Sequence, residues 1–168
     1  MKKCIYLVEG ECEEKLVKAL REKPELVIPG KIRKFNVVQD KLPLNMLVPL
    51  DPGSLVIMVF DTDTDKTEIL KNNLKLLKNL SRSVEALTIA QVLNFEDEIK
   101  RSTDVSSAPL LTKNTSTKDF KAAVNRMKES EFRSLLKRHR FDIQRLWTEK
   151  PPKTFSFVNQ NGDRIKQI

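Results

Sequence analysis

The chain is poor in several residues on which common enzyme chemistries depend. It has one histidine, two cysteines and four glycines among 168 residues. So few glycines provide no glycine-rich phosphate-binding loop. Cys4 and Cys12 lack the spacing of a metal site and are too few for a disulfide framework. His139 stands among basic residues without the partner pattern of a serine or cysteine hydrolase.

Long hydrophobic runs are also absent. The run at residues 55–60 falls far short of the roughly 20 apolar residues that a membrane-spanning helix needs. We therefore expect no membrane anchor and no signal peptide. With so few cysteines, a reducing cytoplasmic location is the natural expectation. Hydrophobic residues make up 39% of the chain and charged residues 32%, which is typical of a soluble globular protein with one ordinary core.

The charge is unevenly distributed along the chain. The 31 basic and 23 acidic residues give a net charge of +8, and a basic protein attracts nucleic acid through counterion release. Glutamates crowd residues 9–14, whereas residues 113–150 carry a basic excess. A solvated helix face accounts for such a basic excess as well as a phosphate-contacting surface does. The candidate nucleic-acid contacts are Lys118, Lys121, Arg126, Lys137, Arg138 and Arg140.

The hydrophobic pattern predicts alternating strands and helices. We expect strands at residues 3–8, 32–38, 54–60 and 84–92. Helices are expected between and after them, at residues 11–21, 42–50, 68–80 and 94–99. The third strand is apolar on both faces, which is typical of a central strand in a parallel sheet. The sequence therefore predicts an α/β fold with a mainly parallel sheet flanked by helices.

The residue pattern changes near residue 105, where the alternation of strands and helices ends. We predict an α/β domain over residues 1–105 and a smaller basic helical extension over residues 106–168. Residues 102–117 are rich in serine and threonine and are expected to form a loop, with amphipathic helices at 117–127 and 131–140. Asn161-Gly162 is a strong turn signal, so residues 155–168 are expected to end the chain in a hairpin.

Acidic side chains follow two of the predicted strands at the point where each strand ends. Glu9 follows the first strand, and Asp61 and Asp63 follow the strand that is apolar on both faces. Ligand sites in parallel sheets gather at the carboxyl ends of the strands, so these side chains are expected to share one crevice. Carboxylate oxygens suit Mg²⁺ or Mn²⁺. Asp65 is expected instead to cap the helix that follows.

Glu13 extends this predicted site. It lies one helical turn beyond Glu9 and can face the same crevice, where it would hold a second metal ion. An acidic start to the helix explains Glu13 equally well, because the helix dipole favours negative charge there.

The two acidic motifs resemble those of the TOPRIM family, which includes topoisomerases, bacterial primases, the overcoming-lysogenization-defect nucleases and small stand-alone bacterial proteins. The first strand of that family ends in Glu-Gly and the second motif is a strand ending in Asp-x-Asp, as at Glu9-Gly10 and at Asp61-Thr62-Asp63 here. The resemblance covers roughly residues 3–92. It implies that the glutamate and both aspartates bind metal and that the glutamate handles a proton in strand cleavage.

The resemblance is greatest to the nuclease branch of the family, whose first motif often reads Glu-Gly-x-x-Glu. Residues 9–13 follow this pattern, with Glu13 as the second glutamate. Residues 92–98 resemble a third acidic motif of small TOPRIM proteins associated with phage defence, which would add Glu96 or Glu98; an exposed helix start is the alternative. The only tyrosine, Tyr6, lies inside the first strand. Topoisomerase activity is therefore not expected.

The predicted function is divalent-metal-dependent cleavage of DNA or RNA, with Glu9, Asp61 and Asp63 as catalytic residues. The same three residues, with Glu13 and Glu96, would hold Mg²⁺ or Mn²⁺. A role in phage defence or repair rests on analogy. Two alternatives stay open: a non-catalytic nucleic-acid or nucleotide-binding module working with a protein partner, and a haloacid-dehalogenase-type phosphatase that attacks with Asp61. The sequence does not choose between monomer and homodimer.

Overall fold

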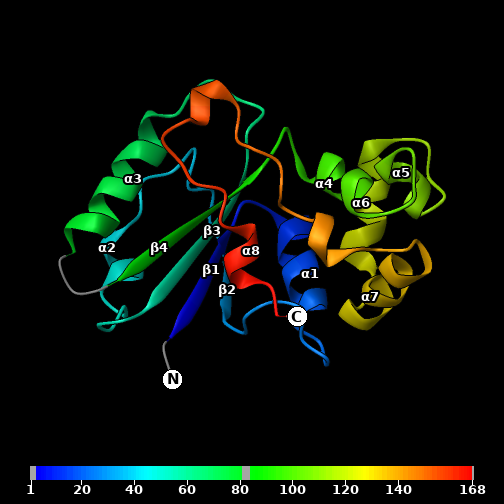
Figure 1. Cartoon of the computed structure of the whole chain (residues 1–168), viewed down its shortest axis with the longest axis horizontal. Helices are drawn as coiled ribbons and strands as arrows, with labels where there is room; N and C mark the ends of the chain where they lie inside the picture. The colour runs from blue at the N-terminus through cyan, green and yellow to red at the C-terminus, as the bar shows by residue number, and fades with distance from the viewer. Residues whose placement is uncertain (1–2, 81–83, 168) are drawn as a thin grey trace.

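Four parallel strands form the centre of the molecule (Figure 1). The computed structural model describes residues 3–80 and 84–167. The sheet has the order β2-β1-β3-β4, and each neighbouring pair is parallel. The strands are β1 (Cys4–Val8), β2 (Lys31–Lys34), β3 (Leu55–Asp61) and β4 (Glu85–Gln91). The predicted α/β class with a parallel sheet flanked by helices is confirmed.

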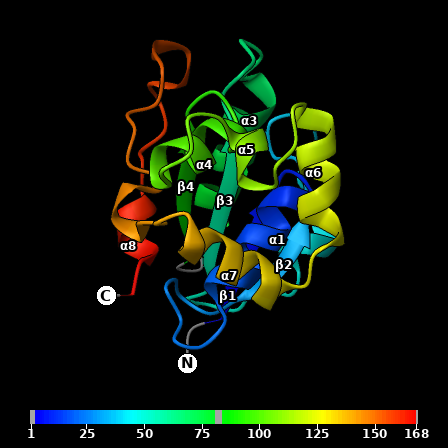
Figure 2. The ribbon, with the colours of Figure 1, turned by 90° about the vertical axis from the view of Figure 1, so that its right-hand side faces the viewer.

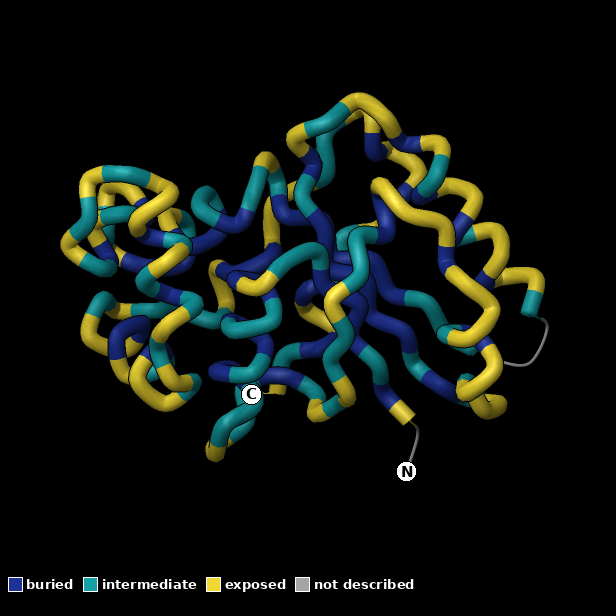
Figure 3. Tube along the Cα trace, turned by 180° about the vertical axis from the view of Figure 1, so that it is seen from behind, coloured by how far each residue is buried: buried dark blue, intermediate teal, exposed yellow. Residues whose placement is uncertain are grey.

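Strand β3 is buried on both faces, as its composition indicates. Val56, Met58 and Phe60 belong to one hydrophobic cluster, and Ile57 and Val59 belong to the other. Successive side chains of a strand point to opposite faces, so an uninterrupted apolar run serves both layers at once. Figure 3 shows the result, with the central strands buried and the exposed residues on the outer surfaces.

Strand β2 is shorter than predicted, because the chain turns after Phe35. The Asn36 side-chain oxygen accepts hydrogen bonds from the backbone N–H groups of Val38 and Gln39, at 3.0 and 3.1 Å. Asparagine often competes with strand pairing in this way. The apolar residues Val37 and Val38 are therefore buried in a loop rather than in the sheet.

Helices cover both faces of the sheet. Residues of α1 (Glu11–Leu20) and α4 (Phe95–Ser102) share the cluster of Ile57 and Val59, whereas α2 (Leu44–Leu47) and α3 (Glu68–Asn79) pack on the other face. Helix α2 is shorter than expected, since Pro43 precedes it and Pro49 follows it. None of the helices in residues 3–80 and 84–167 is long and apolar enough to cross a lipid bilayer.

The C-terminal region is helical, and its helices α6 and α7 pack on α1 (Figure 2). It contains α5 (Ala108–Leu111), α6 (Thr117–Arg126) and α7 (Glu129–Arg138), followed by the 3₁₀ turns η1 (Ile143–Arg145) and η2 (Lys153–Phe155) and by α8 (Gly162–Ile165). Helices α6 and α7 confirm the two predicted amphipathic helices, and α5 lies in the stretch expected to be a loop. Phe120, Phe132 and Trp147 share one hydrophobic cluster with Leu16 and Leu20 of α1.

The predicted terminal hairpin is wrong, because α8 forms where its second strand was expected. Asn161 does not form a hairpin turn; its side-chain oxygen accepts from Thr88 N at 3.1 Å and its own N–H donates to Thr88 O at 2.9 Å. Gly162 is required for close packing, since a Cβ there would lie 2.2 Å from Trp147 O. Ile168, the last residue of the predicted hairpin, lies outside the described residues.

Candidate functional site

Polar side chains gather where the strands end. Asp61 is the last residue of β3, and its backbone N–H donates a 2.9 Å hydrogen bond to Glu9 Oε2, just beyond β1. The parallel register that pairs Val8 with Val59 brings these two residues together across 52 positions of sequence. Glu9 and Asp61 therefore lie together at this edge of the sheet, as expected, and we call the polar side chains gathered there the crevice.

A glutamine joins two of the carboxylates. Gln91 ends β4, pairs with Asp61 in the sheet, and is fully buried. With the nitrogen of its amide turned toward the carboxylates, Gln91 Nε2 donates to Asp61 Oδ1 at 2.8 Å and to Glu13 Oε1 at 3.3 Å. Glu13, in the first turn of α1, is only 6% exposed. The structure thus places Glu13 in the crevice with Asp61.

Glu96 lies in the first turn of α4, beside the same crevice. Its Oε1 forms an ion pair with Lys121 Nζ of α6 at 2.8 Å. Its Oε2 is buried and has no hydrogen-bond donor among the residues that the structure describes. An unpaired buried carboxylate oxygen is unfavourable in a folded protein. A cation or a hydrogen-bond donor bound at this atom would remove the unfavourable energy.

The accumulated negative charge changes the acidity of the group. Burial, together with the charges of Glu13, Glu9, Asp63 and Glu96, raises the pKa of Asp61 to about 9. Burial also raises the pKa of Glu9, against the hydrogen bond from Asp61 N, and Asp63 raises it further. Asp63 itself is exposed. The five predicted carboxylates therefore interact electrostatically as one group.

Glu13 responds to the same surroundings. Burial is the main reason that its pKa is raised, and the charges of Glu9 and Glu96 act in the same direction. Lys121 and a backbone hydrogen bond oppose the rise. A carboxyl group with a raised pKa keeps its proton to a higher pH than an ordinary one.

The carboxylates form hydrogen bonds to neighbouring groups, and they do not surround one common point. In residues 3–80 and 84–167, no three aspartate, glutamate, histidine or cysteine side chains are arranged to hold a single metal ion. The donor set is nonetheless all oxygen, as Mg²⁺ and Mn²⁺ prefer, and Glu96 Oε2 has no hydrogen-bond partner among the described residues. The residues fit a metal chemically, but three of them would have to come closer to one point to coordinate a single ion.

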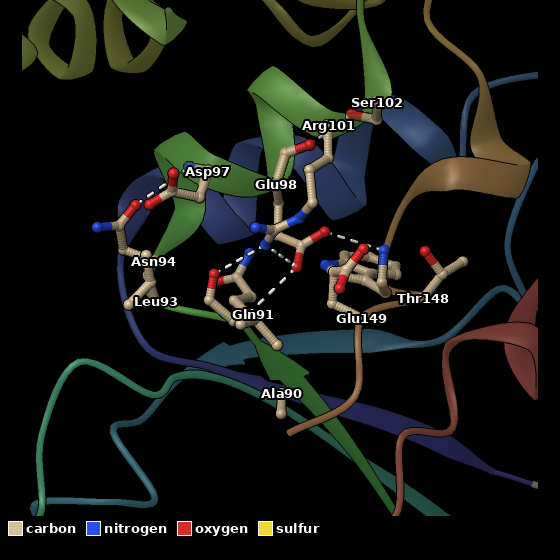
Figure 4. Close-up of polar contacts among 12 residues, drawn as sticks. Ala90, Gln91, Leu93, Asn94, Asp97, Glu98, Arg101, Ser102, Thr148 and Glu149 are labelled. Carbon is tan, nitrogen blue, oxygen red and sulfur yellow. Dashed lines mark hydrogen bonds and ion pairs between the residues drawn. The ribbon is translucent and has the colours of Figure 1, made fainter. Parts of the chain in front are cut away.

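Glu98, the alternative to Glu96, has a different role (Figure 4). It is fully buried, and its Oε1 accepts from Arg101 at 2.7 Å and from Val92 N at 3.3 Å. Its Oε2 accepts from Trp147 N at 3.0 Å. Glu98 therefore ties the C-terminal region to α4 and β4 and lies outside the crevice. The same figure shows Asn94 capping α4 through Asp97 N, as the sequence predicts.

The six candidate basic residues divide into two groups. Lys121 reaches the crevice; burial lowers the pKa of its ammonium, but the hydrogen bond and charge of Glu96 outweigh that effect and the pKa is raised. Lys118 and Arg126 are exposed on the same helix. The remaining three are exposed at the C-terminal end of α7 or just beyond it, where Arg140 approaches Asp104: Lys137, Arg138 and Arg140. Asp104 lies past the far end of α4 from Glu96, so the structure does not bring these three to the crevice.

Two amides at the site were missed by sequence reasoning. Gln91 has been described above, and Asn36 donates a side-chain hydrogen bond that lowers the pKa of Glu9. Both residues lie at or just after the carboxyl end of a strand, as Glu9 and Asp61 do. The rule that located the carboxylates applies equally to neutral polar residues, and that position was the available signal.

Comparison with known proteins adds no relative. The chain matches no protein-family model, no curated protein and no solved structure. The resemblance to the TOPRIM family therefore stays a prediction that rests on the residues of this chain.

Proposed function

We propose that the protein is a divalent-metal-dependent enzyme that cleaves phosphodiester bonds in nucleic acid, using the crevice of Glu9, Asp61 and Asp63. The observation that carries this proposal is the convergence of carboxylates from β1, α1, β3 and α4 at the carboxyl edge of a parallel sheet. Gathering like charges in a partly buried site is unfavourable unless a cation balances them.

The roles of the residues follow from their positions. Glu9, Asp61 and Asp63 would hold Mg²⁺ or Mn²⁺, with Glu13 and Glu96 as further ligands. The bound metal supplies Lewis-acid polarisation of a phosphate oxygen. Glu9 would bind the metal or accept a proton from the attacking water, and the raised pKa of its buried carboxyl group suits the second task.

The substrate class follows from the charge around the crevice. The chain carries a net charge of +8, and Lys118, Lys121 and Arg126 lie on α6, the helix that reaches Glu96. Lysine and arginine at such positions contact phosphates and orient the nucleic-acid backbone. We therefore propose DNA or RNA as substrate, aligned along α6.

The test is a cleavage assay with purified protein, Mg²⁺ or Mn²⁺, and single- and double-stranded DNA and RNA. Asp61→Asn and Glu9→Gln are expected to lower metal-dependent cleavage by on the order of 100-fold or more. Asp65→Asn is the matched control, because Asp65 is an exposed aspartate of the same loop. Equal background cleavage in the wild type and all three variants would overturn the proposal.

A non-catalytic nucleic-acid or nucleotide-binding module is the second candidate. One observation favours it: the Lys121 ammonium already pairs with Glu96, so part of the negative charge is balanced within the chain. Binding of nucleic acid without cleavage, unchanged by chelation of metal, would support this reading. A protein partner, a homodimer, a cytoplasmic location and a role in phage defence or repair remain predictions of the sequence.

A further inference from the structure

The amide of Gln91 is the only neutral group found, within residues 3–80 and 84–167, to bridge two carboxylates of the crevice. It donates one hydrogen bond to Asp61 on β3 and one to Glu13 on α1, at 2.8 and 3.3 Å. The residue is fully buried, and its backbone carbonyl oxygen accepts hydrogen bonds from Thr62 N at 3.1 Å and from Thr62 Oγ1 at 3.0 Å, which fixes the position of its backbone.

An amide is chemically suited to this place. Its –NH₂ group offers two donors on one uncharged atom, so it can hold two carboxylates without neutralising them. A lysine would balance their charge, and a glutamate would add to it. An apolar residue would leave the two carboxylates facing each other with no donor between them. Gln91 therefore adds no charge of its own to the pair.

The bridge also leaves part of each carboxylate free. The amide occupies Asp61 Oδ1 and Glu13 Oε1, and the second oxygen of each group has no contact with it. Gly10 leaves room beside the second oxygen of Glu13, since a Cβ at Gly10 would lie 3.0 Å from Glu13 Oε2. The Gln91 amide thus holds one oxygen of each carboxylate, and Gly10 leaves space beside the other oxygen of Glu13.

We infer that Gln91 is a positioning residue, which orients Asp61 and Glu13 for a divalent cation without binding it. This inference rests on the proposed function, because it concerns the same crevice. Residues that hydrogen-bond metal ligands set ligand orientation, and their loss typically weakens metal affinity by about 10- to 100-fold. Gln91 is expected to fall in this range.

The test is titration of purified full-length protein with Mn²⁺, followed by calorimetry or by the electron paramagnetic resonance signal of free Mn²⁺. Gln91→Met removes both donors while keeping the length of the side chain, and it is expected to weaken Mn²⁺ binding by about 10- to 100-fold. In the cleavage assay, the Mn²⁺ concentration for half-maximal rate should rise by the same factor, whereas kcat at saturating Mn²⁺ should change less.

Gln160→Met is the matched control. Gln160 Nε2 also donates two hydrogen bonds, to Ala90 O at 2.7 Å and to Glu149 O at 2.9 Å, but neither acceptor is a carboxylate. Both variants lose two hydrogen bonds beside β4, so a general effect on the fold would appear in both. Only Gln91→Met is expected to weaken Mn²⁺ binding, and circular dichroism and thermal melting check that each variant folds.

The outcomes separate this inference from the proposed function. If the wild type binds Mn²⁺ but cleaves nothing, the nuclease proposal fails and the variants still decide the role of Gln91. If Gln91→Met is folded and binds Mn²⁺ as tightly as wild type, or if Gln160→Met weakens binding equally, the inference is overturned while the proposed function stands. Absence of saturable Mn²⁺ binding by the wild type overturns both.

Discussion

Helix α4 carries two glutamates, two residues apart, in opposite surroundings. Glu98 is fully buried, and both of its oxygens accept hydrogen bonds, from Arg101, Val92 N and Trp147 N. Glu96 has one oxygen paired with Lys121 and the other buried without a donor among the described residues. Residues i and i+2 of a helix point in nearly opposite directions, which is why these neighbours differ.

The difference separates two uses of buried negative charge. At Glu98, donors from the chain itself form hydrogen bonds with both carboxylate oxygens. These hydrogen bonds connect α4, β4 and the C-terminal region. In the crevice, carboxylates raise one another's pKa and donors are too few. Unmet charge of this kind is typical of sites that bind a ligand.

The largest expected effect concerns Glu98. Glu98→Ala leaves the Arg101 guanidinium and Trp147 N–H without their buried partner. Breaking a buried pair in this way is expected to lower the free energy of unfolding by about 3 kcal/mol. Urea denaturation measures this, and Mn²⁺ affinity of the folded fraction should be unchanged. A loss of Mn²⁺ affinity without a loss of stability would reverse the roles given to Glu98 and the crevice.

Metal should have the next largest effect, through the crevice alone. A cation that binds only the folded state stabilises it by about 2.7 kcal/mol when present at 100 times its Kd. Mn²⁺ is therefore expected to raise the Tm of the wild type and of Glu98→Gln, and to leave Asp61→Asn unchanged. Thermal melting measures this change in Tm. An equal increase in the Tm of the wild type and of Asp61→Asn would show that Mn²⁺ binds elsewhere.

Without metal, Asp61→Asn should stabilise the protein. The pKa of Asp61 is raised from its ordinary value of 3.8 to about 9, so the folded state binds the proton more tightly than the unfolded state. Stability from this group is complete below pH 3.8 and falls as pH rises toward 9. At pH 8 the variant is expected to gain on the order of 1 kcal/mol over the wild type.

That gain should depend on pH in one direction. Denaturation in a chelating buffer should show the advantage of Asp61→Asn growing steadily from acid to alkaline pH. Asp65→Asn, on the exposed part of the same loop, is the control and should show no such trend. An advantage of Asp61→Asn that shrinks as pH rises would contradict the view that the crevice holds unmet negative charge.

The smallest effect is expected on the surface of α6. Lys118→Gln and Arg126→Gln should each weaken nucleic-acid binding only several-fold, and each should lower the salt dependence by about one counterion. Fluorescence anisotropy at a series of salt concentrations measures both quantities. The same changes at Lys137 and Arg138 should do less, because these residues lie away from the crevice. Equal effects would show that nucleic acid does not follow α6.

The sequence predicts most of the sheet and the acids at its edge. Glu9 and Asp61 could be placed together because strands β1 and β3 are strongly apolar and parallel neighbours share one carboxyl edge. The helical phase of α4 was less accessible: without the packing of Phe95 and Ile99, nothing chose Glu96 over Glu98 for the crevice. Gln91 was missed because a neutral amide carries no charge pattern.

The C-terminal region was harder to predict than the sheet. Asn161-Gly162 has the composition of a hairpin turn. Instead, Asn161 forms hydrogen bonds with Thr88 in the outer strand β4, and Gly162 leaves room for Trp147. Both roles depend on contacts between residues that are far apart in the sequence, and local turn preferences contain no information about such contacts.

The cation site is tested by titration of the wild type and of Asp61→Asn with Mn²⁺ at one pH, read by the electron paramagnetic resonance signal of free Mn²⁺. We expect saturable binding by the wild type, and binding weakened by about 100-fold or more when one carboxylate ligand is replaced by an amide. Binding that is equal in the two proteins, or absent from the wild type at millimolar Mn²⁺, would contradict the claim that the crevice is a cation site.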